Sequence, residues 1–149
     1  MVGYGKIVSC IEDICPSLTV TMKECVPTYF HTPALPSISL AEYVQWLVFH
    51  GQFSDECIVG SLIYLDRLVA SNKEFVVNYH SIHKLFLSSL LVSAKFTDDC
   101  FYTNCHYAAV GGVPLWELNL LESQFLMLIG YRCFISSTQY KEFSKRLSN

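Results

Sequence analysis

Two stretches of the sequence decide the fold: IVGSLIYLDRLV at residues 58–69 and IHKLFLSSLLVSAKF at residues 82–96. Apolar residues run nearly all the way round a helix in both, which is typical of helices that are buried on every side. The one run rich in β-branched and aromatic residues, FVVNY at residues 75–79, is too short and isolated to build a sheet. Both stretches are therefore predicted to be the central helices of an all-α bundle.

Start and stop signals elsewhere predict five core helices and one more helix at each end. Asn78 is expected to cap the helix that contains residues 82–96, and Pro114 to open the helix that Gly130 closes. Four prolines between residues 16 and 36 predict an extended connection after the first helix. The predicted helices cover residues 4–14, 38–50, 54–71, 78–96, 102–110, 114–129 and 137–147.

Composition narrows the class of protein. The chain has 149 residues, enough for one domain, with 52% hydrophobic and only 15% charged residues. A net charge of −3 without a basic cluster argues against nucleic acid as a partner. Charges interrupt every long apolar run, and Glu12 and Asp13 do not fit a signal peptide. We expect no membrane segment, a cytoplasmic or nuclear location, and a partner that covers part of the apolar surface.

Two charged residues stand on strongly apolar helix faces. Lys95 follows Leu91 and Val92 at helical spacing, and Glu122 lies among the apolar residues of LNLLESQFLML at residues 118–128. A charge on such a face is normally paired or turned toward a partner. The residues alone leave two interpretations open: a surface that recognises another protein, or a mutual salt bridge between side chains that reach water. Asp66, in the most apolar stretch, is interpreted as structural.

The seven cysteines are scattered, mostly within apolar segments, and are predicted to be reduced and buried. An alternative is a metal-binding or thiol protein built on Cys100, Cys105 and His106, with Cys57 or His80 completing the site. No CxxC pair occurs, and the spacing matches no familiar zinc pattern. The prediction is therefore a protein with no catalytic residues, no metal and no cofactor.

Several motifs in order resemble a cyclin box: YLDRLV at residues 64–69, VSAKFTDDCFYTNCHYAAVGGV at residues 92–113 and ELNLLESQFL at residues 117–126. The run PSISLAEY at residues 36–43 narrows the resemblance to the P- and U-type cyclins, relatives of the fungal phosphate-response cyclins. The resemblance divides the chain into an N-terminal helix and proline-containing connection (residues 1–35), a single cyclin box (36–143) and a C-terminal helix end (144–149).

The resemblance implies a five-helix cyclin fold and a non-catalytic role, in which the chain binds and activates a cyclin-dependent protein kinase as a heterodimer. In such cyclins a lysine and a glutamate at the positions of Lys95 and Glu122 face the kinase. Phe96, Leu126 and Tyr131 match positions of apolar contact.

The first helix of the box departs from the pattern. It reads YVQWLVFH at residues 43–50, with Trp46 and Phe49 where such cyclins often have basic residues. No substrate-docking role is therefore carried over, and Asp66 lacks an obvious cationic partner. An alternative within the same fold is a scaffold for transcription machinery, which the acidic balance and the single box disfavour.

Overall fold

The computed structural model of the protein describes residues 2–148, which form seven α-helices and one 3-10 turn without a strand. The helices are α1 (Tyr4–Ile14), α2 (Leu40–Gly51), α3 (Asp55–Ser71), α4 (Ile82–Thr97), α5 (Asn104–Gly111), α6 (Leu115–Leu128) and α7 (Ser137–Ser148). The prediction of an all-α bundle, five helices of a cyclin box with one more at each end, is confirmed.

The division of the chain into three segments stays a prediction. Its outer limits, residues 1 and 149, lie outside the described residues, and its boundary between residues 143 and 144 falls inside α7.

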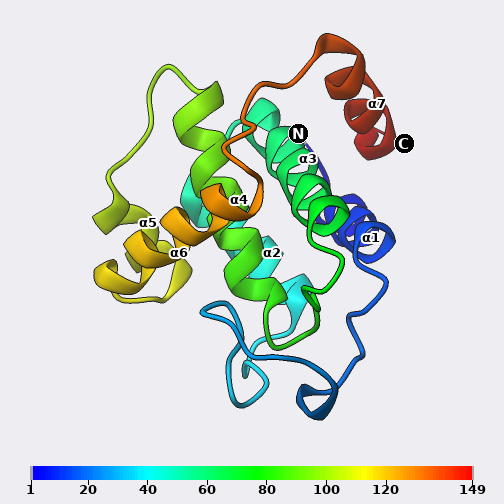
Figure 1. Ribbon diagram of the computed structural model, residues 1–149. Coiled ribbons are helices and arrows are strands. Elements are labelled where there is room, and N and C mark those ends of the chain that lie inside the picture. The colour runs from blue at the N-terminus through cyan, green and yellow to red at the C-terminus, as the bar shows by residue number, and fades with distance from the viewer. Residues whose placement is uncertain (1, 149) are drawn as a thin grey trace.

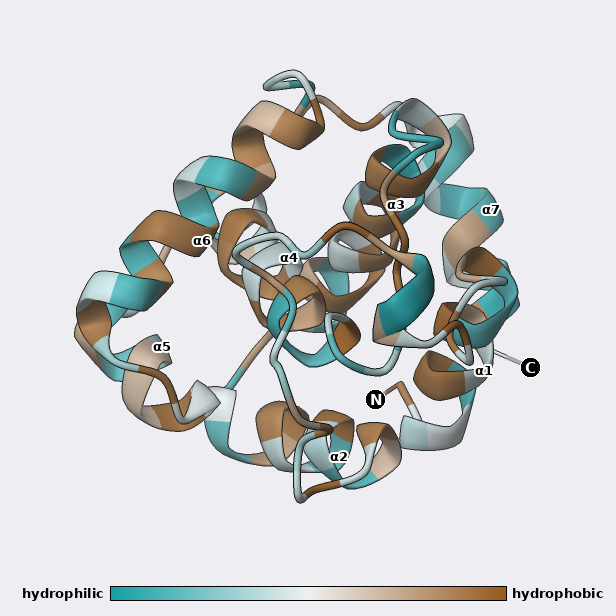
Figure 2. Cartoon of the chain, turned by 60° about the horizontal axis from the view of Figure 1, so that its bottom comes forward, coloured by the Kyte–Doolittle hydropathy of each residue, from teal (hydrophilic) through white to brown (hydrophobic). Residues whose placement is uncertain are grey.

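The core is built around α3 and α4, which lie against each other at the centre of the molecule (Figure 1). Hydrophobic residues gather on these two helices, whereas α7 is largely hydrophilic (Figure 2). Their axes approach closely because Gly60 of α3 has no side chain: a Cβ there would lie 2.4 Å from Ser93 Oγ of α4. That hydroxyl donates to the Cys57 carbonyl at 2.7 Å, so a hydrogen bond fastens the crossing. The prediction that these two helices are central therefore holds.

Side-chain caps explain where three of the helices begin: α2, α3 and α5. Ser39 and Glu42 form a reciprocal capping box at the start of α2. Ser54 Oγ accepts from the Cys57 backbone N–H at the start of α3, and Thr103 Oγ1 accepts from the His106 N–H at the start of α5. Each cap satisfies a backbone donor that has no partner within the helix.

The start of α4 differs from the prediction. Asn78 does not cap it; the helix begins at Ile82, after a turn. The Asn78 Oδ1 atom accepts from the His80 N–H at 3.1 Å, and its Nδ2 donates to the Val20 carbonyl at 3.0 Å. Asparagine often forms such local bonds in place of a helical turn. The Asn78 side chain therefore stabilises the turn before α4 and also binds the connection that contains Val20.

The remaining helices flank the central pair on two sides. In Figure 1, α6 lies on the left beside α4 with α5 packed against it, and α1 and α7 lie on the right beside α3. The connection, residues 15–39, loops below the helices and returns to α2. This arrangement leaves the C-terminal end of α4 and the neighbouring part of α6 at the surface, where Lys95 and Glu122 lie.

Candidate functional site: a charged and aromatic surface at the end of α4

Lys95 lies in the last turn of α4, where a cation is favourable beside the free carbonyls of the helix end. Hydrogen bonds hold this end in place: Thr97 Oγ1 donates to the Ser93 carbonyl at 2.6 Å, and Ser54 Oγ donates to Asp98 at 2.7 Å. The Lys95 side chain is 34% exposed, so its ammonium group reaches the surface from a fixed backbone.

Glu122 lies on α6, which buries Leu118, Leu121 and Phe125 in the core. Lys95 Nζ is 2.8 Å from Glu122 Oε2 and 3.1 Å from Oε1, so the two side chains form a bidentate ion pair between α4 and α6. Glu122 is the more buried partner, with 17% of its side chain exposed. The mutual salt bridge considered from the sequence is therefore present. It lies at the surface, so the pairing leaves the recognition hypothesis open.

Large apolar side chains surround the ion pair. Phe96 is 55% exposed and Tyr131 is 66% exposed, although both are large hydrophobic residues. A hollow of about 170 Å³ lies beside Phe96 and the pair, and its lining combines predicted residues with others that the sequence did not single out: Val92, Lys95, Phe96, Glu122, Leu126 and Cys133. Four of the five predicted contact residues thus line one hollow. An exposed apolar patch of this kind is typical of a protein-binding surface.

Tyr131, the fifth predicted residue, follows α6 in an unusual backbone conformation. Its φ is +57°, and the preceding Gly130 has a φ of +63°. The Tyr131 N–H donates to the Leu126 carbonyl at 2.9 Å, which closes the end of α6 and brings the tyrosine near Leu126. A bulky residue in the left-handed region costs conformational energy that the surrounding structure must balance. The turn therefore holds an exposed aromatic residue after the end of α6 at some conformational cost.

The sequence did not single out Asn104, which completes the polar part of the site. Its Nδ2 donates to Glu122 Oε1 at 3.0 Å and to Asn119 Oδ1 at 2.7 Å. Asn104 lies within the cyclin-like motif at residues 92–113, but its contact with Glu122 depends on how α5 packs on α6. The spacing of Asn119 and Glu122, three residues apart on one helix face, was the one available signal.

A second ion pair links the same two helices elsewhere. Lys84, near the start of α4, pairs with Glu117 in the first turn of α6. These side chains are 22% and 17% exposed, and none of the residues that line the hollow beside Lys95 belongs to this pair. It therefore offers a matched control for the Lys95–Glu122 pair.

Asp66 is half-buried on α3 and makes no hydrogen bond or ion pair within residues 2–148. Burial raises the pKa of its carboxyl group above the ordinary value, and the Arg146 guanidinium opposes that shift. The structural role assigned to Asp66 stays a prediction, since no internal bond of the expected kind is found in this part of the chain.

The metal-binding alternative receives no geometric support. Among the described residues, no group of three or more His, Cys, Asp or Glu side chains is arranged to hold a metal ion. Cys100 and Cys105 are exposed rather than buried, which corrects the expectation for these two thiols. Cys57 is buried and donates to the Leu90 carbonyl, and His80 bonds the Thr32 carbonyl at 2.8 Å. Both proposed fourth ligands are thus engaged elsewhere.

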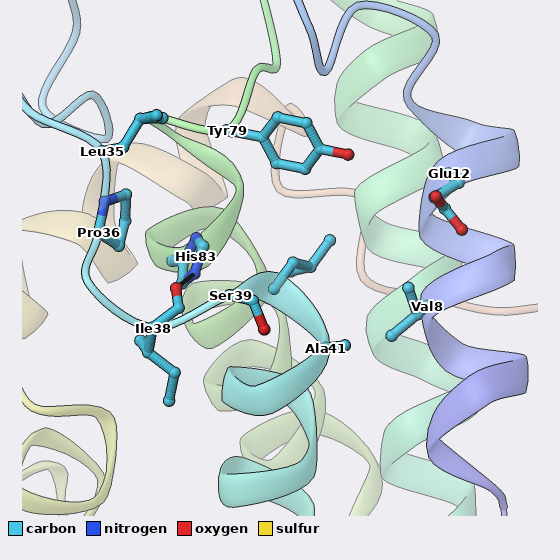
Figure 3. A pocket seen from close by; sticks show the side chains of 10 residues that line it. Val8, Glu12, Leu35, Pro36, Ile38, Ser39, Ala41, Tyr79 and His83 are labelled. Atoms are coloured by element: carbon cyan, nitrogen blue, oxygen red, sulfur yellow. Dashed lines mark hydrogen bonds between the residues drawn. The ribbon is translucent and has the colours of Figure 1, made fainter.

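A larger hollow of about 390 Å³ lies at the opposite end of α4 (Figure 3). Val8 and Glu12 of α1 face the start of α2 across it, and the Tyr79 ring points into the gap between them. His83, at the base, bonds the Ile38 carbonyl of the connection at 2.9 Å through Nε2. The hollow shares no lining residue with the one beside Lys95, so the two are separate features.

The fold is an all-helical bundle with an ion pair between α4 and α6 and exposed aromatic residues within or just after these two helices. The model of the family described as Cyclin matches residues 10–133 of this chain. The chain belongs to the cyclin family. Within the described residues, no helix has both the length and the apolar character to cross a membrane.

The relatives narrow the group to the U- and P-type and fungal cyclins. Cyclin-U4-2 of Arabidopsis thaliana is 36% identical over 118 residues, which make up 79% of this chain and 55% of that protein. PHO85 cyclin-like protein psl1 of Schizosaccharomyces pombe is 37% identical over 108 residues, 72% of this chain and 44% of the relative. The Nuc-1 negative regulatory protein preg of Neurospora crassa is 36% identical over 105 residues, which make up 70% of this chain and 22% of that protein. The chain thus spans about half the length of these relatives or less.

Proposed function

We propose that this chain is a regulatory subunit that binds and activates a cyclin-dependent serine/threonine protein kinase as a heterodimer. Membership of the cyclin family supports a regulatory, non-catalytic role. The relative psl1 is named as a PHO85 cyclin-like protein, which links that relative to PHO85. The observation that carries the proposal is the surface at the end of α4, where the Lys95–Glu122 pair, Phe96 and Leu126 line one hollow. Tyr131, the fifth residue that the resemblance assigned to kinase contact, is exposed and is bonded through its backbone N–H to the Leu126 carbonyl.

The task of such a subunit is to hold a kinase in its active arrangement. An active kinase pairs a strand lysine with a glutamate on its mobile helix. A rigid partner that packs only on the assembled arrangement shifts the population toward it by its differential affinity. A shift from almost all inactive to almost all active takes about 5.5 kcal/mol. At roughly 25 cal/mol per Å² of buried apolar surface, that corresponds to about 220 Å², an area that a few aromatic and aliphatic side chains can bury.

Charge and apolar contact have different roles in this mechanism. Phe96, Leu126 and Tyr131 supply most of the binding free energy, because their apolar surface is removed from water. Lys95 is one-third exposed, so solvent screens its attraction for a partner, and the pair contributes mainly to register and to the rejection of wrong partners. The two side chains are already paired in the free protein.

The test is affinity capture from a native lysate with the full chain as bait, followed by identification of the bound kinase. Lys95→Glu and Glu122→Lys should each abolish capture while the helical circular dichroism stays unchanged. The double swap restores an internal ion pair with the charges exchanged, and should still fail to capture the kinase. Lys84→Glu, which disrupts the other ion pair between the same helices, should capture it normally. Kinase capture by both single variants at the wild-type level would refute the proposed surface.

A further inference from the structure

The side-chain amide of Asn104 has an unusual set of hydrogen bonds. Both hydrogens of Nδ2 are used by acceptors on α6, Asn119 Oδ1 at 2.7 Å and Glu122 Oε1 at 3.0 Å. The other end of the same amide, Oδ1, is buried and has no hydrogen-bond partner among the described residues. The opposite orientation would place an oxygen against two oxygens, so the network fixes the assignment of the two atoms. A buried unsatisfied acceptor is costly and asks for an explanation.

The backbone places Asn104 where this contact is unavoidable. Asn104 is the first residue of α5, and the preceding Thr103 caps the helix through the His106 N–H. The helix start is therefore fixed, and it packs beside α6. Asn119 and Glu122 lie three residues apart, on one face of α6, so a single amide reaches both.

Glu122 is consequently held from two sides. Its Oε1 accepts from Asn104 and from Lys95, whereas in the described part of the chain its Oε2 is approached by Lys95 alone. The terminal torsion of a glutamate is broad, and Lys95 is a flexible side chain that is one-third exposed. The ion pair by itself therefore leaves the carboxylate free to follow the long lysine side chain, whereas the amide is carried by a short side chain at the capped start of α5.

We propose that Asn104 is a positioning residue that locks the Glu122 carboxylate, so that Oε2 and the remaining donor of Lys95 stay available to a partner. A neutral amide serves this purpose better than a second cation. It orients the carboxylate and leaves the charge balance of the pair unchanged. The kinase-binding part of this inference rests on the proposed function, whereas the locking of Glu122 is a property of the free chain.

The first measurement needs no partner. Carbon-13 relaxation of the Glu122 side-chain methylene groups should report a rigid side chain in the wild-type protein. Asn104→Ala should make these groups mobile, and Asn104→Asp, which has the same shape, should do so at neutral pH because two carboxylates then face each other. Ser39→Ala removes the cap of α2, a helix that makes no bond to Asn104, Asn119 or Glu122 among the described residues, so it should leave Glu122 rigid. Unchanged rigidity in both Asn104 variants would overturn the inference.

The second measurement is a double-mutant cycle on affinity for the purified kinase that the capture experiment identifies. Asn104→Ala should weaken binding about tenfold, the scale of one lost hydrogen bond to a charged group. In a Glu122→Gln background the same substitution should have no further effect, whereas a merely structural role would add its full cost there. Additive effects would reject the positioning role. If Glu122→Gln itself left binding unchanged, the proposed function would fail at this surface even where the relaxation data show a locked carboxylate.

Discussion

The two ends of α4 present opposite chemistry. At the end that contains His83, the imidazole is buried and bonded to a backbone carbonyl of the connection, and the neighbouring Lys84–Glu117 ion pair is mostly buried. At the end that contains Lys95, the polar groups are ionised and reach solvent, and the nearby rings of Phe96 and Tyr131 are exposed. Twelve residues separate the two positions, which is roughly 18 Å along a helix.

At the His83 end, the polar side chains are bonded to other segments of the same chain. His83 is 7% exposed, bonds the Ile38 carbonyl and lies against the Tyr43 ring at 5.0 Å. His31, in the connection, bonds the Val76 carbonyl at 2.9 Å, and the Thr32 N–H donates to the His80 carbonyl. One end of the central helix thus serves to hold the N-terminal segment. If the proposed function holds, stability and recognition are carried by opposite ends of one helix.

The largest expected effect is on kinase affinity, from a substitution at the Lys95 end of α4. Phe96→Ala removes an exposed ring, so the free energy of unfolding should change by less than about 0.5 kcal/mol. Affinity for the kinase should fall by about 2 kcal/mol, or roughly 30-fold, because a central aromatic contact is lost. Urea denaturation and calorimetric titration measure the two quantities. A large loss of stability without a loss of affinity would contradict the assignment of this end.

The matched change at the other end should show the reverse. His83→Ala leaves the Ile38 carbonyl without its donor and opens a gap beside Tyr43, so unfolding should become easier by about 2–3 kcal/mol. The affinity of the folded fraction should stay at the wild-type level. Should this variant bind the kinase more weakly once the unfolded fraction is corrected for, the two ends are coupled.

The pH dependence of stability should also come from the His83 end. Burial lowers the pKa of His31 and of His83 from the ordinary value of 6.5, so both imidazoles remain neutral in the folded protein. The unfolded chain then binds more protons near pH 6, and the free energy of unfolding should fall as the pH drops below about 6.5. Urea midpoints at pH 7.5, 6.0 and 5.0 would measure this decline.

The control is the double variant His31→Gln and His83→Gln, which should flatten the decline between pH 7.5 and 5. Burial raises the pKa of Asp66 from 3.8, so this carboxyl works in the opposite direction at lower pH, where its protonation relieves a cost of folding. An equally steep decline in the double variant would exclude the two imidazoles as its source.

Tyr131 offers a smaller test at the Lys95 end. Tyr131→Gly relieves the positive φ of a bulky residue, although the unfolded chain gains entropy, so stability should rise by at most about 1 kcal/mol. Kinase affinity should fall, because an exposed aromatic ring is removed. Gln52→Gly relieves the other positive φ of a non-glycine residue in the described range and should leave affinity unchanged. A loss of stability in Tyr131→Gly would show that the ring itself packs on the free protein.

Local signals predicted most of the fold. The helices Tyr4–Ile14 and Asp55–Ser71 begin and end as expected, because a proline after the first and a serine cap before the second act within a few residues. The predicted start of α4 was wrong because the Asn78 side chain bonds Val20, which is far away in the sequence, instead of capping the helix. Pro114 occupies the cap rather than the first turn of α6, a shift of one residue.

The candidate site was predictable only in part. Charges on apolar faces and the family motifs pointed to Lys95 and Glu122, but the residues could not decide whether the two side chains meet, since that distance depends on how α4 packs on α6. Asn104 and the histidines that hold the connection were missed for the same reason. Each of them acts through a contact between segments that are distant in the sequence.

The smallest expected effect compares the two ion pairs between α4 and α6. A double-mutant cycle with Lys84→Met and Glu117→Gln should give a coupling free energy of up to about 1 kcal/mol, because both side chains are mostly buried. The corresponding cycle for Lys95 and Glu122 should give less, since the more exposed lysine is better screened by solvent. Thermal denaturation of the free protein at low and at high salt measures both couplings. A larger coupling for the Lys95 pair would mean that this pair stabilises the bundle, and the division of roles between the two ends of α4 would then have to be abandoned.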